Sequence, residues 1–265
     1  VLKEHFDEEN IVYWMAFQIL MGNVDTQNRN VYLYSPLNSD IWYFIAWDND
    51  GCLMRPEYEL RNFSDQNSWE KGISNYWGNI LFQRCLKSRS FREKLNDAIL
   101  DLREYLNKDM LTSKIESYKN VLKPYLYLMP DAEYEPLTSE QYDQIAASLP
   151  DEIEKNYQLY LESLETPMPF YIGVPTIDGD KLKFNWDVSY DLDAEDITYS
   201  VEVAGDYLFR DVIYQNTTLT VPEAEMDLPK AGQYFVRVRA TNTSGKTQDA
   251  FDYYITDEGK HYGMK

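Results

Sequence analysis

Apolar residues near the amino terminus recur with the period of an α-helix. Between Asp7 and Gly22 they are Ile11, Val12, Met15, Ala16, Ile19 and Leu20. This spacing lines one face of a helix. Asp7 can cap the start, because its side chain accepts hydrogen bonds from the first free N–H groups, and Gly22 can end the helix. We therefore predict a helix between these two residues.

The two runs that follow have the composition of β-strands. Residues 30–34, "NVYLY", and 41–47, "IWYFIAW", are rich in β-branched and aromatic residues, and "SPLNSD" between them supplies turn residues. Together they predict a β-hairpin. Core packing is the simplest interpretation of the aromatic residues at periodic positions, for example Tyr32, Tyr34, Trp42 and Phe44.

A stretch without a steady period separates the hairpin from further helices. Residues 51–74 carry Gly, Pro, Ser and Asn and predict a long irregular loop, a length that is more often functional than idle. Helical spacing then returns, with a break expected at Pro150 because proline lacks the N–H that a helix interior needs. The predicted helices span 75–87, 90–106, 109–128 and 138–165. Residues 1–165 are thus predicted to form a mainly α domain with one β-hairpin.

The composition changes at "ETPMPF", residues 165–170, where two prolines mark a linker at 166–169. Beyond it, strand runs and turn signals alternate at the spacing of a β-sandwich. The runs are "KLKFNWDVSY", "ITYSVEVA", "TTLTVPE" and "QYFVRVRATN". We predict an all-β domain over residues 170–256, followed by a tail at 257–265.

This second domain resembles the fibronectin type III domain. The residues that carry the resemblance are Leu228, Gly232, Tyr234, Val236, Val238, Ala240, Asn242 and Gly245, together with Trp186 and Tyr199. The resemblance implies an immunoglobulin-like sandwich of seven strands, with Trp186 in its core and Tyr234 at the corner that opens a late strand. Such domains are mostly spacers or docking surfaces, so the resemblance implies no catalysis.

Charge and cysteine content narrow the classes of function. The 45 acidic and 25 basic residues give a net charge of −20, which repels phosphate backbones and argues against nucleic acid as a partner. Cys52 and Cys85 form neither a disulfide framework nor a zinc spacing. No apolar run approaches the roughly 18 residues of a membrane-spanning helix. The amino terminus has neither an initiator Met nor a signal-peptide pattern, so we expect a piece of a longer protein.

The 23 tyrosines and 6 tryptophans raise the alternative of carbohydrate binding, in which aromatic rings stack on sugar faces. Most of them fall at periodic positions, where core packing is the simpler explanation. Trp69, Tyr76 and Trp77 lie in or beside the long loop, and they are the aromatic residues that we consider for ligand contact.

The candidate chemistry lies around the predicted hairpin. Asp25 precedes it, Asn30 follows five residues later, and Asp48 and Asp50 come at the end of its second strand. Carboxylates that end so apolar a run indicate a cation site. In protein kinases one Asp orients the acceptor hydroxyl, an Asn five residues later holds a metal, and an Asp after a hairpin holds metal against the phosphates. Asp25, Asn30 and Asp48 follow this order and spacing.

Simpler interpretations of the same residues stay open at this point. Asp25 and Asn30 are compatible with the caps and turns of a helix-to-hairpin loop, and Asp48 and Asp50 with an Asx turn. Arg29 lies in the same loop and could bind phosphate, although a lone arginine there is more often in a surface ion pair.

The segment resembles the spore-coat CotH family of atypical protein kinases. The resemblance is carried by Phe6-Asp7, the helix with Tyr13, "GNVD", "NVYLY" and "WYFIAWDND"; it covers residues 1–165 and is clearest over 6–50. It implies Mg²⁺ and ATP as cofactors and a kinase-like C-terminal lobe. The resemblance also implies the roles of single residues: Asp25 is the catalytic-loop carboxylate, Asn30 a metal ligand, Asp48 the principal metal ligand, and Asp50 lies near the same ion.

The chain departs from the family pattern in two residues and in extent. Ala46 stands where the family usually has Pro, and Asn49 replaces a common apolar residue; both are expected to loosen the end of the hairpin. The nucleotide-gripping lobe of the family, with its phosphate-binding Lys, would precede Val1. We therefore expect this chain by itself to be catalytically silent.

Two functions remain open. In the first, the chain is part of a CotH-type kinase that transfers a phosphoryl group from Mg-ATP to a hydroxyl of a protein substrate. In the second, it is a non-catalytic scaffold that presents a kinase-like fold and a β-sandwich to surface partners. A β-sandwich and strong acidity suit an extracellular setting, so we expect the protein to be secreted or displayed on a bacterial cell surface.

Overall fold

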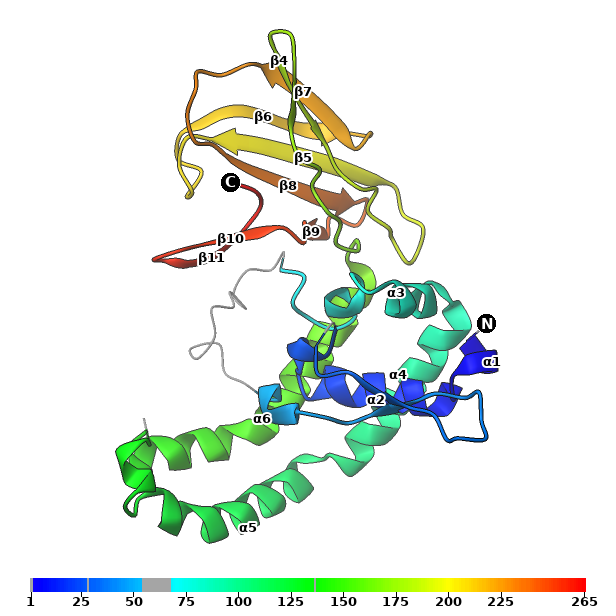
Figure 1. The fold of residues 1–265 in the computed structure, drawn as a ribbon, viewed down its shortest axis with the longest axis vertical. Coiled ribbons are helices and arrows are strands. Elements are labelled where there is room, and N and C mark those ends of the chain that lie inside the picture. Colours follow the sequence, from blue (N-terminus) through cyan, green and yellow to red (C-terminus); the bar gives the residue numbers. More distant parts are fainter. Residues whose placement is uncertain (1, 28, 54–67, 136) are drawn as a thin grey trace. The chain divides into compact units, whose positions relative to one another are not determined.

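A computed structural model of the chain describes residues 2–27, 29–53, 68–135 and 137–265. These residues divide into two compact units (Figure 1). The first is formed by residues 1–53 with 88–158, and the second by residues 54–87 with 159–265. In the part of the chain that the structure describes, no helix is both long enough and apolar enough to cross a membrane.

The first unit consists of helices and one short hairpin. Its helices are α1 (Leu2–His5), α2 (Glu8–Leu20), α4 (Arg89–Tyr105), α5 (Lys108–Leu126) and α6 (Ser139–Glu165), the last of which continues into the second unit; its strands are β1 (Tyr32–Tyr34) and β2 (Tyr43–Ile45), and its 3₁₀ turns are η1 (Val24–Gln27), η2 (Asn49–Gly51) and η5 (Asp131–Glu133). The predicted order of helix, hairpin and helices is confirmed. The predicted irregular loop at 51–74 falls mostly on residues 54–67, which lie outside the described residues.

Helix α2 is the centre of the first unit. The Asp7 side chain accepts a hydrogen bond of 2.8 Å from the backbone N–H of Asn10, and Gly22 takes a left-handed backbone with φ of +62°. Both predicted ends of the helix are therefore confirmed. The buried residues cover most of the helix circumference, as expected for a helix in a core, and α4 packs against it. They are Ile11, Val12, Trp14, Met15, Ala16, Gln18, Ile19 and Leu20.

Helix α6 runs without interruption through Pro150, so the predicted break is wrong. A proline inside a helix removes one backbone hydrogen bond and costs on the order of 3 kcal/mol. The buried residues Ala146, Ile153 and Tyr160 are spaced by seven along the helix, and this spacing places them on one face. Burial of that face on both sides of Pro150 offsets the local cost.

The hairpin buries only part of its aromatic residues. Strands β1 and β2 pair antiparallel, with Leu33 opposite Phe44, which confirms the hairpin. Phe44 is 4% exposed, whereas Tyr32, Tyr34 and Trp42 are 52%, 54% and 43% exposed, so core packing was the wrong interpretation for these three. The Asn10 side chain exchanges hydrogen bonds of 2.6 and 3.1 Å with the backbone of Phe44. This contact attaches the hairpin to α2 through β2.

The second unit contains the remaining elements. They are α3 (Ile80–Lys87), the 3₁₀ turn η4 (Ser74–Tyr76) and the strands β3 (Thr176–Asp178), β4 (Lys181–Asn185), β5 (Ile197–Ala204), β6 (Val212–Leu219), β7 (Glu223–Asp227), β8 (Phe235–Asn242), β9 (Thr247–Asp249), β10 (Tyr253–Thr256) and β11 (Gly259–Tyr262). The strands form antiparallel sheets in the orders β3-β4-β7, β6-β5-β8-β9 and β10-β11.

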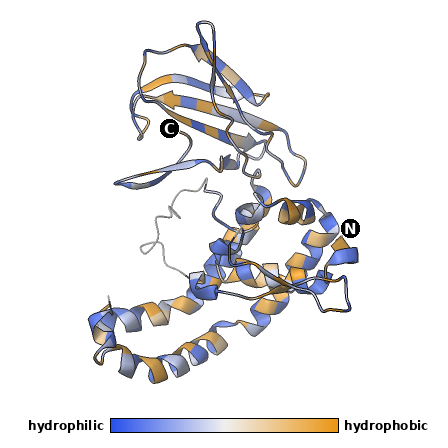
Figure 2. Ribbon diagram, in the orientation of Figure 1, coloured by the Kyte–Doolittle hydropathy of each residue, from blue (hydrophilic) through white to orange (hydrophobic). Residues whose placement is uncertain are grey.

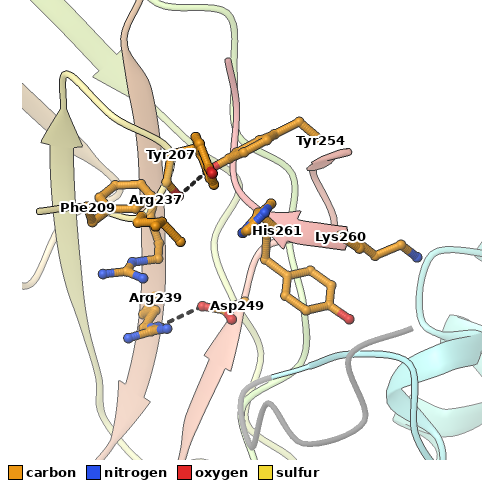
Figure 3. Close-up of a pocket in the computed structure, with 10 residues that line it drawn as sticks. Tyr207, Phe209, Arg237, Arg239, Asp249, Tyr254, Lys260 and His261 are labelled. Atoms are coloured by element: carbon orange, nitrogen blue, oxygen red, sulfur yellow. Dashed lines mark hydrogen bonds and ion pairs between the residues drawn. The ribbon is translucent and has the colours of Figure 1, made fainter. Parts of the chain in front are cut away.

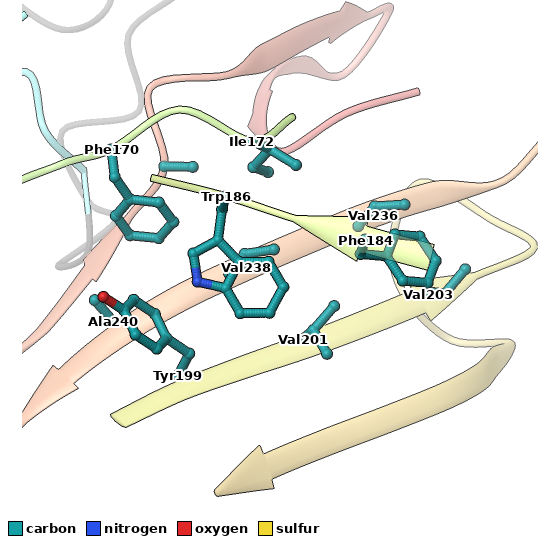
Figure 4. Packing of buried hydrophobic residues seen from close by; sticks show 11 residues of the cluster. Phe170, Ile172, Phe184, Trp186, Tyr199, Val201, Val203, Val236, Val238 and Ala240 are labelled. Atoms are coloured by element: carbon teal, nitrogen blue, oxygen red, sulfur yellow. The ribbon is translucent and has the colours of Figure 1, made fainter. Parts of the chain in front are cut away.

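The three-stranded and four-stranded sheets share one hydrophobic core (Figure 4). Phe184 and Trp186 meet alternate residues of β5 and β8, among them Val201 and Val238. This alternation is visible in Figure 2 as hydrophobic and hydrophilic residues taking turns along both strands. The predicted core position of Trp186 is confirmed, and Tyr234 packs against the same cluster while partly buried.

Two further segments belong to this unit. The predicted tail at 257–265 contains β11, which pairs with β10, and Met264 exchanges two backbone hydrogen bonds with Val236. Trp69, Tyr76 and Trp77, which we considered for ligand contact, are all buried. Their rings pack against other aromatic residues, respectively Phe251, Phe82 and Tyr190. The domain limits predicted from the sequence stay a prediction.

We expect Trp186→Ala to lower the free energy of unfolding of the second unit by about 3–5 kcal/mol, because truncation of a large buried aromatic residue leaves a cavity. Trp186 is 5% exposed, and its ring meets that of Tyr199 at 5.6 Å. Denaturant unfolding followed by circular dichroism measures the change. The control is Val188→Ala, since Val188 is 74% exposed. Equal midpoints for the two variants would contradict the assigned core.

Candidate functional site

The loop that carries Asp25 starts at a turn that requires glycine. Gly22 has a left-handed backbone, and a Cβ at this position would lie 2.7 Å from the Asn156 side chain, so a larger residue would be strained and crowded. Asn156 of α6 donates a hydrogen bond of 2.9 Å to the carbonyl of Leu20, where α2 ends. The turn is thus held from outside, and it leads directly into η1, where Asp25 is exposed.

Asp48 and Asp50 lie in the turn that follows β2. Asp48 has a left-handed backbone with φ of +51°, a conformation that Asp tolerates better than most residues. Gly51 then comes close to the Asp25 loop: a Cβ at Gly51 would lie 3.0 Å from Oδ1 of Asn23 and 3.5 Å from Oδ2 of Asp25. The two carboxylate-bearing segments are therefore adjacent.

A partly buried hydrogen-bond network joins these two segments. Oδ1 of Asn49 accepts hydrogen bonds from Nε2 of Gln18 at 3.1 Å and from Nδ2 of Asn23 at 3.3 Å. Gln18 and Asn23 are almost completely buried. A further backbone hydrogen bond of 2.7 Å joins the N–H of Leu53 to the carbonyl of Met21. The expectation that Asn49 loosens the hairpin end is therefore wrong, because its amide attaches that end to α2.

The carboxylates of Asp25 and Asp50 both affect the ionisation of Asp48. The negative charge of Asp50 raises the pKa of Asp48 above its ordinary value of 3.8, and partial desolvation, a hydrogen bond with Asp50 and the charge of Asp25 act in the same direction. Carboxylates that oppose each other's ionisation in this way are a common arrangement at cation sites and catalytic centres.

Cys52 lies beside this turn, but its chemistry is different. Burial raises the pKa of the thiol to about 12, and the charge of Asp50 adds to the effect. The free thiol is therefore uncharged at neutral pH.

Asn30 lies at the end of the Asp25 loop. It has a left-handed backbone with φ of +54° and is partly buried, and the backbone N–H of Arg29 before it donates to the carbonyl of Asp25 at 3.2 Å. Its role as a metal ligand stays a prediction. Within the described ranges, no group of three or more His, Cys, Asp or Glu side chains is placed to hold a metal ion.

Comparison with protein families matches residues 1–160 to the family described as CotH kinase protein. The chain belongs to the CotH kinase protein family. The match runs from α1 into α6 and includes Asp25, Asn30, Asp48 and Asp50. No curated protein and no solved structure matches the chain.

Sequence reasoning missed the residues that bring the parts of this CotH site together. Gln18 offered one signal, since it is a polar residue within a helix that is otherwise apolar around it, and such a residue usually has a buried partner. Asn23 and Asn49 offered none, because asparagine is common in solvent-exposed loops and turns.

We expect Asp48→Asn to raise the melting temperature in cation-free buffer at neutral pH. The pKa of Asp48 is raised in the folded state above its ordinary value of 3.8. Its contribution to the free energy of unfolding is therefore fully present at a pH below this ordinary value, and it is lost as the pH rises through the folded-state pKa. The difference between variant and wild type should therefore be small at pH 3 and grow toward pH 7. Calorimetric scans measure it.

Asp40→Asn, in the exposed turn of the hairpin, is the matched control for this experiment. A constant difference between Asp48→Asn and wild type across the pH range would contradict the repulsion between the carboxylates. A pH-dependent gain in the Asp40→Asn control would do so as well.

Asn49→Ala should lower the free energy of unfolding of the first unit by about 1–3 kcal/mol. The substitution removes the oxygen that accepts hydrogen bonds from the Gln18 and Asn23 side chains, and the loss of hydrogen bonds by buried polar groups carries a cost of this size. Urea unfolding measures the change. Asn38→Ala, at an exposed position of the hairpin turn, should stay within about 0.5 kcal/mol of wild type. A neutral effect of Asn49→Ala would show that the network does not hold the site.

Proposed function

We propose that this chain supplies the metal-holding part of a protein kinase that transfers a phosphoryl group from Mg-ATP to a hydroxyl of a protein substrate. The observation that carries the proposal is the close approach of the turn with Asp48 and Asp50 to the Asp25 loop, where a Cβ at Gly51 would lie 3.5 Å from Oδ2 of Asp25, in a chain of the CotH kinase protein family. Three carboxylates are held near one another at a cost, and a bound cation would remove that cost.

The residues fit a hard divalent cation. Their donor atoms are carboxylate and amide oxygens, and Mg²⁺ prefers oxygen ligands. Mg²⁺ in kinases is usually held by one or two protein carboxylates together with phosphate oxygens and water, rather than by a complete cage of protein ligands. We propose Asp48 as the principal ligand, Asn30 as a second ligand and Asp50 as a contributor near the same ion.

The proposed role of Asp25 follows from its position. Its carboxylate is exposed on η1, so an acceptor hydroxyl from another protein could reach it. In this role Asp25 would accept a hydrogen bond from the hydroxyl, orient its oxygen and take up its proton, while the γ-phosphoryl group would pass to that oxygen and its bond to the bridging oxygen of ADP would break. Mg²⁺, when bound, supplies positive charge that stabilises the phosphates during transfer.

We also propose that residues 170–256 form a fibronectin type III-like sandwich that serves as a spacer or docking module. The sheet orders β3-β4-β7 and β6-β5-β8-β9 support this assignment. So does Tyr234, whose hydroxyl donates a hydrogen bond of 2.8 Å to the carbonyl of Lys230 in the manner of a tyrosine corner. This module suits the proposed location, secreted or on a bacterial cell or spore surface.

Two linked measurements test the proposed kinase function. Calorimetric titration with Mg²⁺ should give heat with wild type and none with Asp48→Ala, while Asp40→Ala behaves as wild type. Transfer of labelled phosphate from ATP to protein is then measured with this chain and with the product of the complete gene. We expect Asp25→Ala to lower transfer by at least about 100-fold, since that is the scale of general-base catalysis.

The possible results separate the two functions. Transfer that is lost in both Asp25→Ala and Asp48→Ala supports the kinase. Equal Mg²⁺ heats for wild type and Asp48→Ala would remove the metal assignment. Absence of transfer in every form of the protein would favour the non-catalytic scaffold instead.

A further inference from the structure

Helix α5 of the first unit buries very little of its surface. Among its 19 residues, all of which the structure describes, Leu111 is the one that is buried. A helix in a folded protein gains most of its stability by packing an apolar face against a partner, and an isolated helix of this length is marginal in water. The low burial of α5 therefore directs attention to its exposed side.

Hydrophobic residues recur along the exposed side of α5 (Figure 2). Four of them have the spacing i, i+3, i+4 and i+7 of a single helix face, and two more follow directly after the helix. Each is between 53% and 74% exposed. Single apolar residues on a surface are normal, but contiguous ones mark interaction sites. The six residues, which we call the α5 stripe, are Tyr118, Val121, Leu122, Tyr125, Leu128 and Met129.

Helix α6 lies along a different side of α5. Ion pairs of 2.6 Å join Lys123 to Asp143 and Lys108 to Asp151, so the two helices run antiparallel (Figure 1). In a helix with 3.6 residues per turn, Lys108 and Lys123 point about 80° and 140° away from Tyr118. The contact with α6 therefore leaves the α5 stripe uncovered.

The area of the α5 stripe suits a weak, reversible interface. A tyrosine buries about 150–250 Å² and an aliphatic side chain roughly 60–120 Å². At the exposed fractions of the six residues, two copies of the stripe would together bury about 700–1,200 Å². Stable complexes bury more than this, and transient ones fall in this range.

The charges at the two ends of the stripe complement each other. Lys114 is exposed and lies on the same face, seven residues before Val121. Beyond the other end, Asp131 and Glu133 are exposed in the acidic turn η5. In an antiparallel pair of α5 helices with a two-fold axis at Leu122, Lys114 of each copy would lie opposite the start of η5 in the other copy. This arrangement brings opposite charges together twice, which favours a second copy as the partner.

We propose that the α5 stripe is the contact surface of a reversible homodimer, in which two copies of this chain pack their α5 helices antiparallel. A two-fold contact uses the same surface on both copies, so one apolar stripe with opposite charges at its ends is sufficient. The net charge of −20 opposes association, but at physiological ionic strength salt screens repulsion beyond about 8 Å. Dimer formation is independent of the proposed kinase function, because no residue of the carboxylate site lies in the stripe.

Sedimentation equilibrium of the whole chain in physiological salt measures the association. We expect a monomer–dimer equilibrium with a Kd of about 10–500 µM, as for a small interface. Leu122→Glu should weaken it by at least about tenfold, because the dimer would bring two carboxylates into an apolar contact. The matched control is Leu37→Glu, at a fully exposed leucine of the β1-β2 hairpin, which should dimerise like wild type.

Charge reversal tests the antiparallel arrangement. Lys114→Glu and Asp131→Lys should each weaken the dimer by about two- to tenfold, since exposed ion pairs are worth little individually and each occurs twice. The combination of both substitutions in one chain should restore the affinity. A purely structural role of either residue would give no such restoration.

Disulfide formation tests the register of the two helices. A cysteine at the two-fold axis faces its own copy, so Leu122→Cys should form an intermolecular disulfide under mild oxidation. Asn120→Cys is the matched control, because Asn120 is exposed on the opposite side of α5. Its cross-linking should not exceed that of wild type, which already carries Cys52 and Cys85.

Several results would overturn the proposal. A chain that stays monomeric up to about 1 mM, above the expected Kd, would leave the stripe to a different partner. A dimer that is as tight in Leu122→Glu as in Leu37→Glu would place the contact elsewhere. Equal cross-linking of Leu122→Cys and Asn120→Cys, or no restoration in the charge-reversed combination, would rule out the antiparallel pairing of α5.

Discussion

The arrangement of the candidate site depends on the two hydrogen bonds that Asn49 accepts from Gln18 and Asn23. Gln18 is part of α2, Asn23 starts the loop of Asp25, and Asn49 lies between Asp48 and Asp50. Because buried amides without partners are costly, the end of the hairpin is held against the end of α2. Both carboxylate-bearing segments then lie in the same place, whatever the exposed parts of the hairpin do.

Holding the carboxylates together works against stability. Asp48 has a left-handed backbone, and its neighbours oppose its ionisation. A chain with a net charge of −20 has no general reason to gather more negative charge at one turn. Such local costs persist when the surrounding structure determines the geometry, which here comes from the Asn49 network and from Asn156 at the preceding turn.

In the second unit, residues near Trp69 hold the β10-β11 hairpin in position. Trp69 is buried beside Phe251, and Glu70 next to it accepts hydrogen bonds from Lys260 and Tyr262. These contacts fix the β10-β11 hairpin, whose Tyr254 and His261 line a small pocket (Figure 3). Buried residues far apart in the chain thus fix the position of this hairpin.

Local patterns were sufficient for the elements of the fold. The period of apolar residues, the cap at Asp7 and the glycine at position 22 identified α2, and the alternation of β5 and β8 identified the sheet core, because these features depend on neighbours in the chain. Long-range packing set the rest. Gln18 and Asn49 are 31 residues apart, and Glu70 and Lys260 are 190 apart. Such long-range contacts determine which side of the hairpin is exposed, why α6 continues through Pro150 and which residues bind Asn49. The spacing of apolar residues along the chain carries no information about these contacts.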